Sequence, residues 1–332
     1  MATDNKQEIL VEQKTIERTK GLFGSINPYS GIAEAGRTYN FVGALLAKNL
    51  TKNRSDLDNK GLRKTSIPEI KDGEIFAEWY TAYKSIESAK NNYLMISLGA
   101  HLGGPIVNAY KLLNCYKPMP AHFIAIEADE NMYKLLRENF KENNIPASSV
   151  TINQLAVNSS SQPRVFASSK TPTGSTRFYD DVRQLPTKII ESNASELVLE
   201  PILKHAKTFI PIKVVNDGPP ADAELNIVST IQVEHIIKPH KIINFIEADI
   251  QGQEYESLPP AMDMLSEKVA WMHIGTHIDS EWHKLLKKLF IMHGWELHID
   301  WEPNSTYKIE NEKFDTCDGV LSMCNPRVLD RL

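Results

Sequence analysis

The chain has 332 residues, a net charge of −5 and a pI near 6.1. This length allows one large domain or two small ones with ample core, and the negative charge argues against nucleic acid as the main partner. The three cysteines, Cys115, Cys317 and Cys324, have no metal-type spacing, so we expect reduced thiols in a cytoplasmic protein. The first twenty residues are too polar for a signal peptide, and no stretch approaches a membrane span.

Residues 1–92 are expected to form a helical region that differs in character from the rest. Apolar residues at helical spacing indicate helices at 41–50 and 75–90. Glycine, asparagine and proline mark loops before and between them. In the second helix, Trp79 is expected to pack in the core, with the lining of a ligand entrance as the alternative.

The segment 93–129 is the one around which the remaining chain is organised. An apolar strand is followed at once by Gly99, Gly103 and Gly104, then by a helical stripe and a second strand that ends at Glu127. Glycine lets a backbone turn sharply and a ligand approach closely, and the next helix offers free N–H groups. An acid at the end of the second strand can accept both hydroxyls of a ribose, which is the role predicted for Glu127. The pattern is half of a nucleotide-binding α/β unit.

The glycine spacing differs from Gly-x-Gly-x-x-Gly and from a P-loop. It favours S-adenosylmethionine, which has a ribose but no phosphate to cradle. The end of the third strand is expected to face the adenine, with a solvated strand end as the alternative. The predicted cofactor-binding residues are Gly99, His101, Gly103, Glu127, Ala128, Asn153, Ala156 and Asp249.

The rest of the chain alternates strands and helices with one interruption. Residues 158–220 break the rhythm, which predicts an insertion over the substrate side of the site, or else a surface excursion. Helices are expected at 129–142, capped by Asp129, and at 279–293. The residues of the second helix expected to face inward are Trp282, Leu285, Leu286, Leu289 and Phe290. Further strands are expected at 150–157, 241–249, 269–275, 295–301 and 314–323. These elements predict an α/β fold with a seven-stranded doubly wound sheet spanning 93–330.

Polar residues at the strand ends are the candidates for chemistry, because ligands of open α/β sheets bind beyond those ends. Asp249, Glu254 and His277 are the predicted catalytic residues. The alternatives are a helix cap for Asp249, a first-turn acid for Glu254 and a solvated loop residue for His277. Among them only His277 has an ordinary pKa near neutrality, which suits a general base.

A metal site is not expected. His273 and His277 lie four residues apart in extended chain, roughly 13 Å at about 3.3 Å per residue, too far to share a zinc ion. Magnesium held by Asp249 and a neighbouring acid is harder to dismiss.

Several segments together resemble the FkbM-type S-adenosylmethionine-dependent methyltransferases. They are residues 96–103, 126–129, 247–254, 273–277 and 318–327, so the resemblance covers about 74–328. It implies the class I methyltransferase fold and methyl transfer, usually to oxygen on a sugar, glycolipid or natural product. Gln251 stands where the family usually has Glu, which leaves a peptide side-chain amide nitrogen in a modified natural-product peptide as an alternative acceptor.

A second alternative is a cofactor-binding interaction module without catalysis. The expected partners are a small-molecule, glycan or peptide substrate and, as a further expectation, a second copy in a homodimer.

Overall fold

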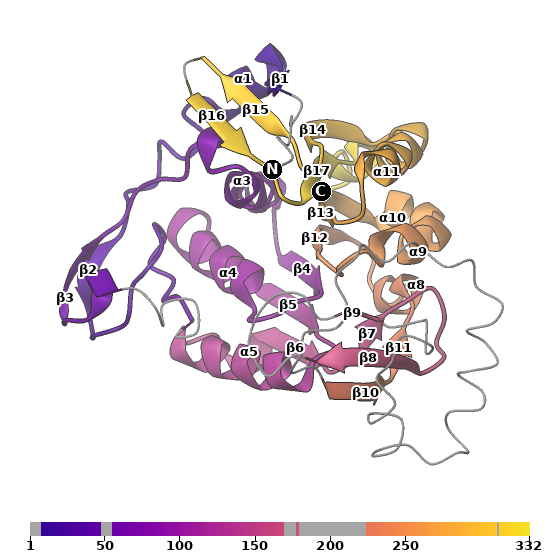
Figure 1. Ribbon diagram of the computed structural model, residues 1–332, viewed down its shortest axis with the longest axis horizontal. Helices are drawn as coiled ribbons and strands as arrows, with labels where there is room; N and C mark the ends of the chain where they lie inside the picture. The colour runs from indigo at the N-terminus through magenta and orange to yellow at the C-terminus, as the bar shows by residue number, and fades with distance from the viewer. Residues whose placement is uncertain (1–7, 48–54, 169–176, 179–223, 311) are drawn as a thin grey trace, which may run out of the picture.

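The computed structural model describes residues 8–47, 55–168, 177–178, 224–310 and 312–332. Among these residues, no helix has the length and apolar character needed to cross a bilayer. The described part is an α/β structure built around one central sheet (Figure 1).

The central sheet has seven strands in the order β14-β17-β13-β12-β4-β5-β6. Their bounds are β4 Tyr93–Leu98, β5 Ala121–Ile126, β6 Val150–Asn153, β12 Ile243–Ala248, β13 Val269–Thr276, β14 Glu296–Trp301 and β17 Gly319–Cys324. β17 runs antiparallel to both its neighbours. Every residue of β4, β12 and β17 is buried, which explains their nearly continuous apolar runs. The expected seven-stranded sheet is confirmed.

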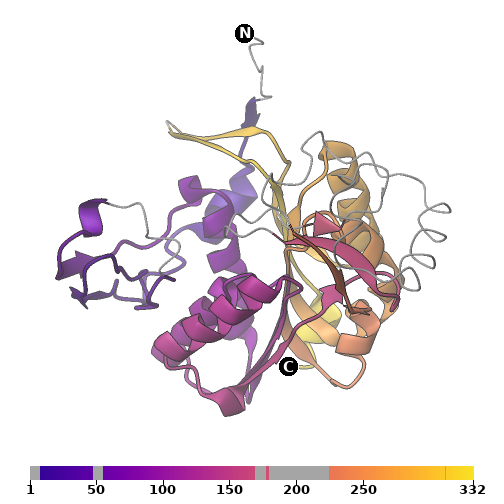
Figure 2. The same ribbon diagram turned by 60° about the horizontal axis from the view of Figure 1, so that its bottom comes forward.

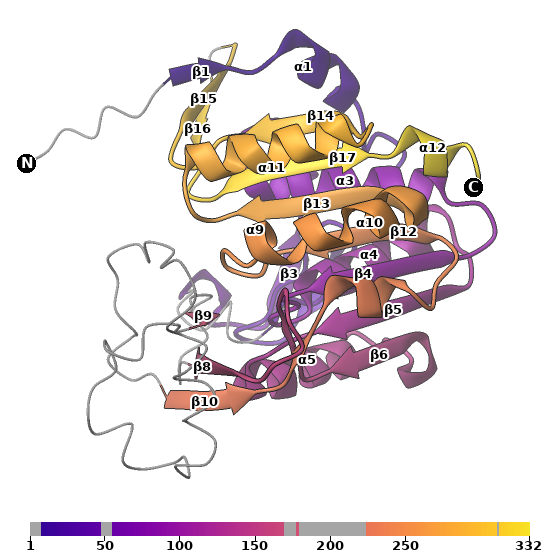
Figure 3. The same cartoon turned by 90° about the vertical axis from the view of Figure 1, so that its right-hand side faces the viewer.

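Helices cover both faces of this sheet, which makes it doubly wound (Figures 2 and 3). On one face lie α3 (Glu74–Ser88), α4 (Gly104–Tyr116) and α5 (Glu130–Glu142), whose apolar residues share a core with α12 (Pro326–Leu329). On the other face lie α8 (Val233–Ile237), α9 (Glu254–Ser257), η5 (Pro259–Ala261), α10 (Met262–Lys268) and α11 (Ser280–Met292). The two cores use alternate residues of the same strands.

The N-terminal region is only partly helical, which corrects the expectation for 1–92. Its described elements are β1 (Glu8–Leu10), α1 (Gln13–Thr19), β2 (Ser30–Ala33), η1 (Ser55–Leu57), β3 (Gly61–Lys64), η2 (Ile70–Asp72) and α3. β1 pairs with β15 (Thr306–Ile309), which pairs with β16 (Glu312–Asp315).

The predicted helix at 41–50 is wrong for residues 41–47, and residues 48–50 lie outside the described part. The chain forms a turn closed by a bridge between Tyr39 and Leu45. The Asn40 side chain accepts the N–H groups of Val42 and Ala44, and such local bonds compete with a helix. The apolar spacing favoured a helix, but the Asn40 side chain accepts two backbone N–H groups that a helix would have used.

The third predicted strand, 150–157, is divided into β6 and a two-residue β7 (Ala156–Val157), with η3 (Ala147–Ser149) before it. β7 leaves the main sheet and pairs with β11 (Thr230–Ile231). β8 (Arg164–Ser168), β9 (Arg177–Phe178) and β10 (Glu224–Val228) form a further small sheet. Most of the predicted insertion at 158–220 lies outside the described residues, and so does its expected substrate-side role.

Candidate active site

The glycine turn after β4 has two kinds of glycine. Gly99 and Gly103 have φ of +81° and +75°, which favours glycine. A Cβ at Gly99 would overlap the Asp249 carbonyl oxygen, and one at Gly103 would overlap Phe140 of α5. These two glycines therefore allow the turn to pack against its neighbours, which corrects the expectation that Gly103 opens the backbone to a ligand.

Gly104, the first residue of α4, is the glycine that faces open space. A Cβ built there meets no heavy atom within 4 Å. Because the first N–H groups of a helix have no partner within it, this end of α4 offers donors to a bound ligand.

Glu127 lies directly beside this turn. Its Oε2 accepts the His101 N–H at 2.6 Å, and its Oε1 accepts the Asp129 N–H at 2.7 Å. Burial raises the pKa of the Glu127 carboxyl to about 7, although the backbone donors oppose the rise. The carboxyl thus joins the glycine turn to the end of β5.

His101, within the turn, has an unsatisfied polar atom. Its φ is +48°, and its Nε2 is buried without a hydrogen-bond partner. Burial lowers the pKa of His101 despite the nearby charge of Asp249, so the ring is neutral near pH 7. Because an unpaired buried polar atom is costly, a ligand group that bonds to Nε2 would be favoured.

The other predicted cofactor contacts are less uniform. Ala128 follows Glu127 and is half-buried, and the Asn153 carbonyl accepts the Glu127 N–H at 3.0 Å. Ala156 lies in β7, where its side chain is buried and its N–H donates to the Ser229 carbonyl. This N–H is therefore not available to an adenine.

The three predicted catalytic residues meet at the edge of β12 and β13. His277 Nε2 lies 2.9 Å from Asp249 Oδ1, and His277 Nδ1 lies 3.1 Å from Glu254 Oε1. Gln251 Nε2 lies 2.9 Å from both Asp249 Oδ1 and His277 Nε2. Glu254 is fully buried, and its two oxygens accept the N–H groups of residues 250 and 252. Glu254 thus holds the turn after β12 as well as facing the histidine.

The charges of this cluster are coupled. Burial lowers the pKa of His277, but the carboxylates of Glu254 and Asp249 outweigh it and raise that pKa well above its usual value. Burial likewise raises the pKa of Asp249, but its hydrogen bond with His277 outweighs this and the net pKa is lowered. Both shifts favour the ionised forms, an imidazolium beside a carboxylate. The expectation of an unperturbed histidine is corrected.

Asp249, Glu254 and His277 also offer ligand atoms within 4.8 Å of one another, so they are the residues near this edge that could hold a metal ion. His273 is elsewhere: its Nδ1 lies 3.0 Å from Ser322 Oγ, and burial lowers its pKa to about 4.

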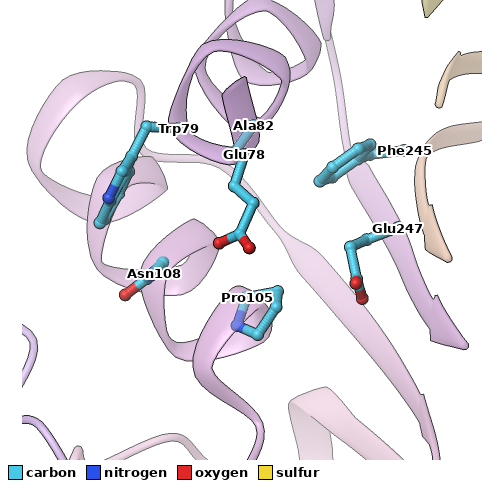
Figure 4. A pocket seen from close by; sticks show the side chains of 7 residues that line it. All are labelled: Glu78, Trp79, Ala82, Pro105, Asn108, Phe245 and Glu247. Atoms are coloured by element: carbon cyan, nitrogen blue, oxygen red, sulfur yellow. The ribbon is translucent and has the colours of Figure 1, made fainter. Parts of the chain in front are cut away.

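Sequence reasoning missed two acids, the half-buried Glu78 of α3 and the buried Glu247 of β12. Burial raises the pKa of Glu78 to about 8 and that of Glu247 well above its usual value, and the charge of Asp249 adds to both shifts. Figure 4 shows both carboxyl groups facing a small pocket beside Pro105. The available signal was Glu247 itself, a charged residue inside an apolar strand and two positions before Asp249, hence on the same face.

No protein-family profile matches the chain, and no curated protein matches it by sequence. Solved structures do match. They include an FkbM methyltransferase from Methylobacillus flagellatus (12% identity, 70% of this chain, 44% of that chain, TM-score 0.37). Another is precorrin-6y C5,15-methyltransferase from Geobacter metallireducens (8% identity, 73% of this chain, 84% of that chain, TM-score 0.36). A third is a putative RNA methyltransferase from Pyrococcus horikoshii (10% identity, 78% of this chain, 91% of that chain, TM-score 0.35).

The matched region spans less than half of the FkbM protein. These low identities and TM-scores assign no acceptor and no residue role. The fold itself is the α/β, seven-stranded doubly wound sheet expected from the sequence, with β17 antiparallel to both its neighbours.

Proposed function

We propose that this protein is an S-adenosylmethionine-dependent methyltransferase. The observation that carries the proposal is the position of Glu127, which bonds to the glycine turn at the ends of β4 and β5. The unpaired Nε2 of His101 and the open space at Gly104 fit a polar ligand there. Asp249 and His277 lie at the neighbouring strand ends, where an acceptor would be placed.

When bound, S-adenosylmethionine supplies an electrophilic methyl group on a sulfonium. The residues of the chain orient the acceptor for in-line attack and exclude water, which together supply much of the rate. We favour a hydroxyl of a sugar, glycolipid or natural product as the acceptor. His277, after losing its proton, would take the hydroxyl proton at Nε2, and Glu254, which faces Nδ1, would stabilise the resulting imidazolium.

A peptide side-chain amide is the second candidate acceptor. It is favoured by Gln251, whose amide nitrogen lies 2.9 Å from Asp249 Oδ1 and so shows that this carboxylate can accept from an amide.

Calorimetry with S-adenosylhomocysteine tests the cofactor site. Glu127→Ala removes the ribose acceptor, so affinity should fall by about 1–3 kcal/mol, the range for a lost buried hydrogen bond. Glu138→Ala on the outer face of α5 is the matched control and should bind as wild type. Equal affinity in the two variants would contradict the proposed site, provided both melt cooperatively.

A further inference from the structure

A small pocket lies beneath the strand edge that carries Asp249. Its walls come from three elements: Glu78, Trp79 and Ala82 of α3, Pro105 and Asn108 of α4, and Phe245 and Glu247 of β12 (Figure 4). The space at its centre is about 10 Å³, which is room for about one water-sized group. The pocket therefore selects a compact head group.

The pocket contains carboxyl groups with unused acceptor capacity. Glu247 is 4% exposed and uses one oxygen to accept the Ser97 hydroxyl at 2.5 Å. Its other oxygen has no hydrogen-bond partner among the described residues, and neither does Glu78. No lysine or arginine of the described part pairs with either acid. Both acids therefore keep acceptor oxygens that the donors of a ligand could use.

The other walls favour a cation. Trp79 and Phe245 bring aromatic rings to the same small space, and aromatic faces attract positive charge. An ammonium group is the size of water and has three donors for the carboxyl oxygens. A guanidinium is too large for this space, and an anion brings no donors for the carboxyl oxygens.

We propose that this pocket binds the ammonium group of an amine-bearing methyl acceptor, an inference that rests on the proposed function. Both acids and both rings belong to α3 and β12, whereas the glycine turn and the ribose acid belong to the β4–β5 half. Glu247 precedes Asp249 by two residues, or about 7 Å along the strand. The ammonium is thus an anchor, and the atom that receives the methyl lies nearer the edge.

The segment before α3 holds the pocket walls in place. Asn40 Nδ2 donates to Asn108 Oδ1 at 2.7 Å, and the Phe41 ring lies 4.5 Å, edge to face, from that of Trp79. The turn that replaced the predicted helix therefore supports the anchor site.

Propylammonium is a suitable probe, with propanol as its neutral counterpart. Each is titrated by NMR into the whole protein with and without S-adenosylhomocysteine. We expect saturable binding of propylammonium only, weakened about tenfold or more in Glu78→Gln and Glu247→Gln, because a charged hydrogen bond is lost in each. Glu281→Gln, an acid 85% exposed on α11, is the matched control and should bind as wild type.

Proton release provides a readout that a structural role would not change. The two acids are near Glu74, Asp249, Glu254 and the neutral His273. Burial raises the pKa of Glu78 to about 8, so at pH 7 Glu78 holds a proton that an incoming ammonium should displace. Wild type and the control should release protons on binding the amine, as the heat in buffers of different ionisation enthalpy reports. The Glu78→Gln variant should release fewer.

Equal binding of propylammonium and propanol, or binding of neither, would overturn the anchor site. A loss of S-adenosylhomocysteine affinity in both Gln variants, as large as their loss of amine affinity, would assign the ammonium to the cofactor and overturn the acceptor assignment. If the protein binds the amine but never binds S-adenosylhomocysteine, the proposed function and the acceptor assignment would be refuted. The pocket would then still be a cation-binding site.

Discussion

At the scale of single residues, Gly103 and Gly104 are adjacent but face different surroundings. The missing Cβ of Gly103 is where Phe140 packs, and that of Gly104 is open. Substitution at the first should disturb the fold, and substitution at the second should obstruct the ligand.

Gly104→Val should therefore weaken binding of S-adenosylhomocysteine about tenfold or more while the melting temperature stays near wild type. Gly103→Val should lower the melting temperature, because it combines a positive φ with overlap in the core. Calorimetry and thermal melts on both variants measure the contrast. Reversed effects would show that the ligand passes over Gly103 instead.

His277 is the residue whose electrostatic environment matters most for rate. If the acceptor is a hydroxyl, His277→Ala should lower kcat by about 10²–10⁴-fold with cofactor affinity near wild type. Because neighbouring carboxylates raise the pKa of His277, the wild-type rate should rise with pH only above the ordinary histidine range. Asp249→Asn should move that rise to lower pH. A pH profile identical in wild type and His277→Ala would leave the histidine without a role as base.

At the scale of elements, α11 shows how a helix was predicted correctly and its buried face was not. The expected inward residues Trp282 and Leu285 are 37% and 57% exposed, whereas Leu286 and Phe290 are buried. His283 is buried and bonds to Thr276 at the end of β13 and to Asp300 of β14. His283, which bonds to residues of two strands, thus occupies a buried position that the apolar pattern had assigned to the solvent-facing side of the helix.

The start of α11 depends on Asp279, whose Oδ1 accepts the N–H groups of Glu281 and Trp282 at 3.0 Å each. Asp279→Ala should reduce the free energy of unfolding by about 1 kcal/mol, the usual cost of losing an N-cap. Urea unfolding measures it, and Asp279→Asn, which keeps a capping oxygen, should lose much less. A null effect in the alanine variant would mean that packing alone sets this helix start.

At the scale of the whole molecule, one half-buried and one buried acid make stability depend on pH. Glu78 and Glu127 have folded pKa values of about 8 and about 7, raised by burial. Such groups stabilise the fold below their unfolded pKa, and this is lost as pH rises through the folded values. The contributions of His273 and His298 to stability have the opposite pH dependence, because burial lowers their pKa values to about 4. They destabilise the fold only below the usual histidine pKa.

The free energy of unfolding should therefore fall between about pH 6.5 and 9, where the histidines no longer oppose the acids. Glu78→Gln should flatten this decline, and the exposed Glu281→Gln should not. Urea denaturation across this range provides the measurement. Stability that is constant or rising up to pH 9 would show that the acids are ionised in the folded protein.

The sequence alone was sufficient for the elements whose pattern is local. Buried parallel strands must be continuous apolar runs, so β4, β5, β12 and β13 were predictable, as was the cap at Asp129. Polar residues at the ends of those strands were bound to meet at one edge, which is why Asp249, Glu254 and His277 were found together.

Only the tertiary structure decided the properties that depend on neighbours distant in the chain. The roles of Gly99 and Gly103 follow from Asp249 and Phe140, which approach them from other elements. The raised pKa of His277 follows from carboxylates 23 and 28 positions away. Glu78 lies before the first strand of the sheet, and only the packing of α3 against β12 places it beside Glu247. Burial and charge pairing are properties of the assembled fold, so no local pattern contains them.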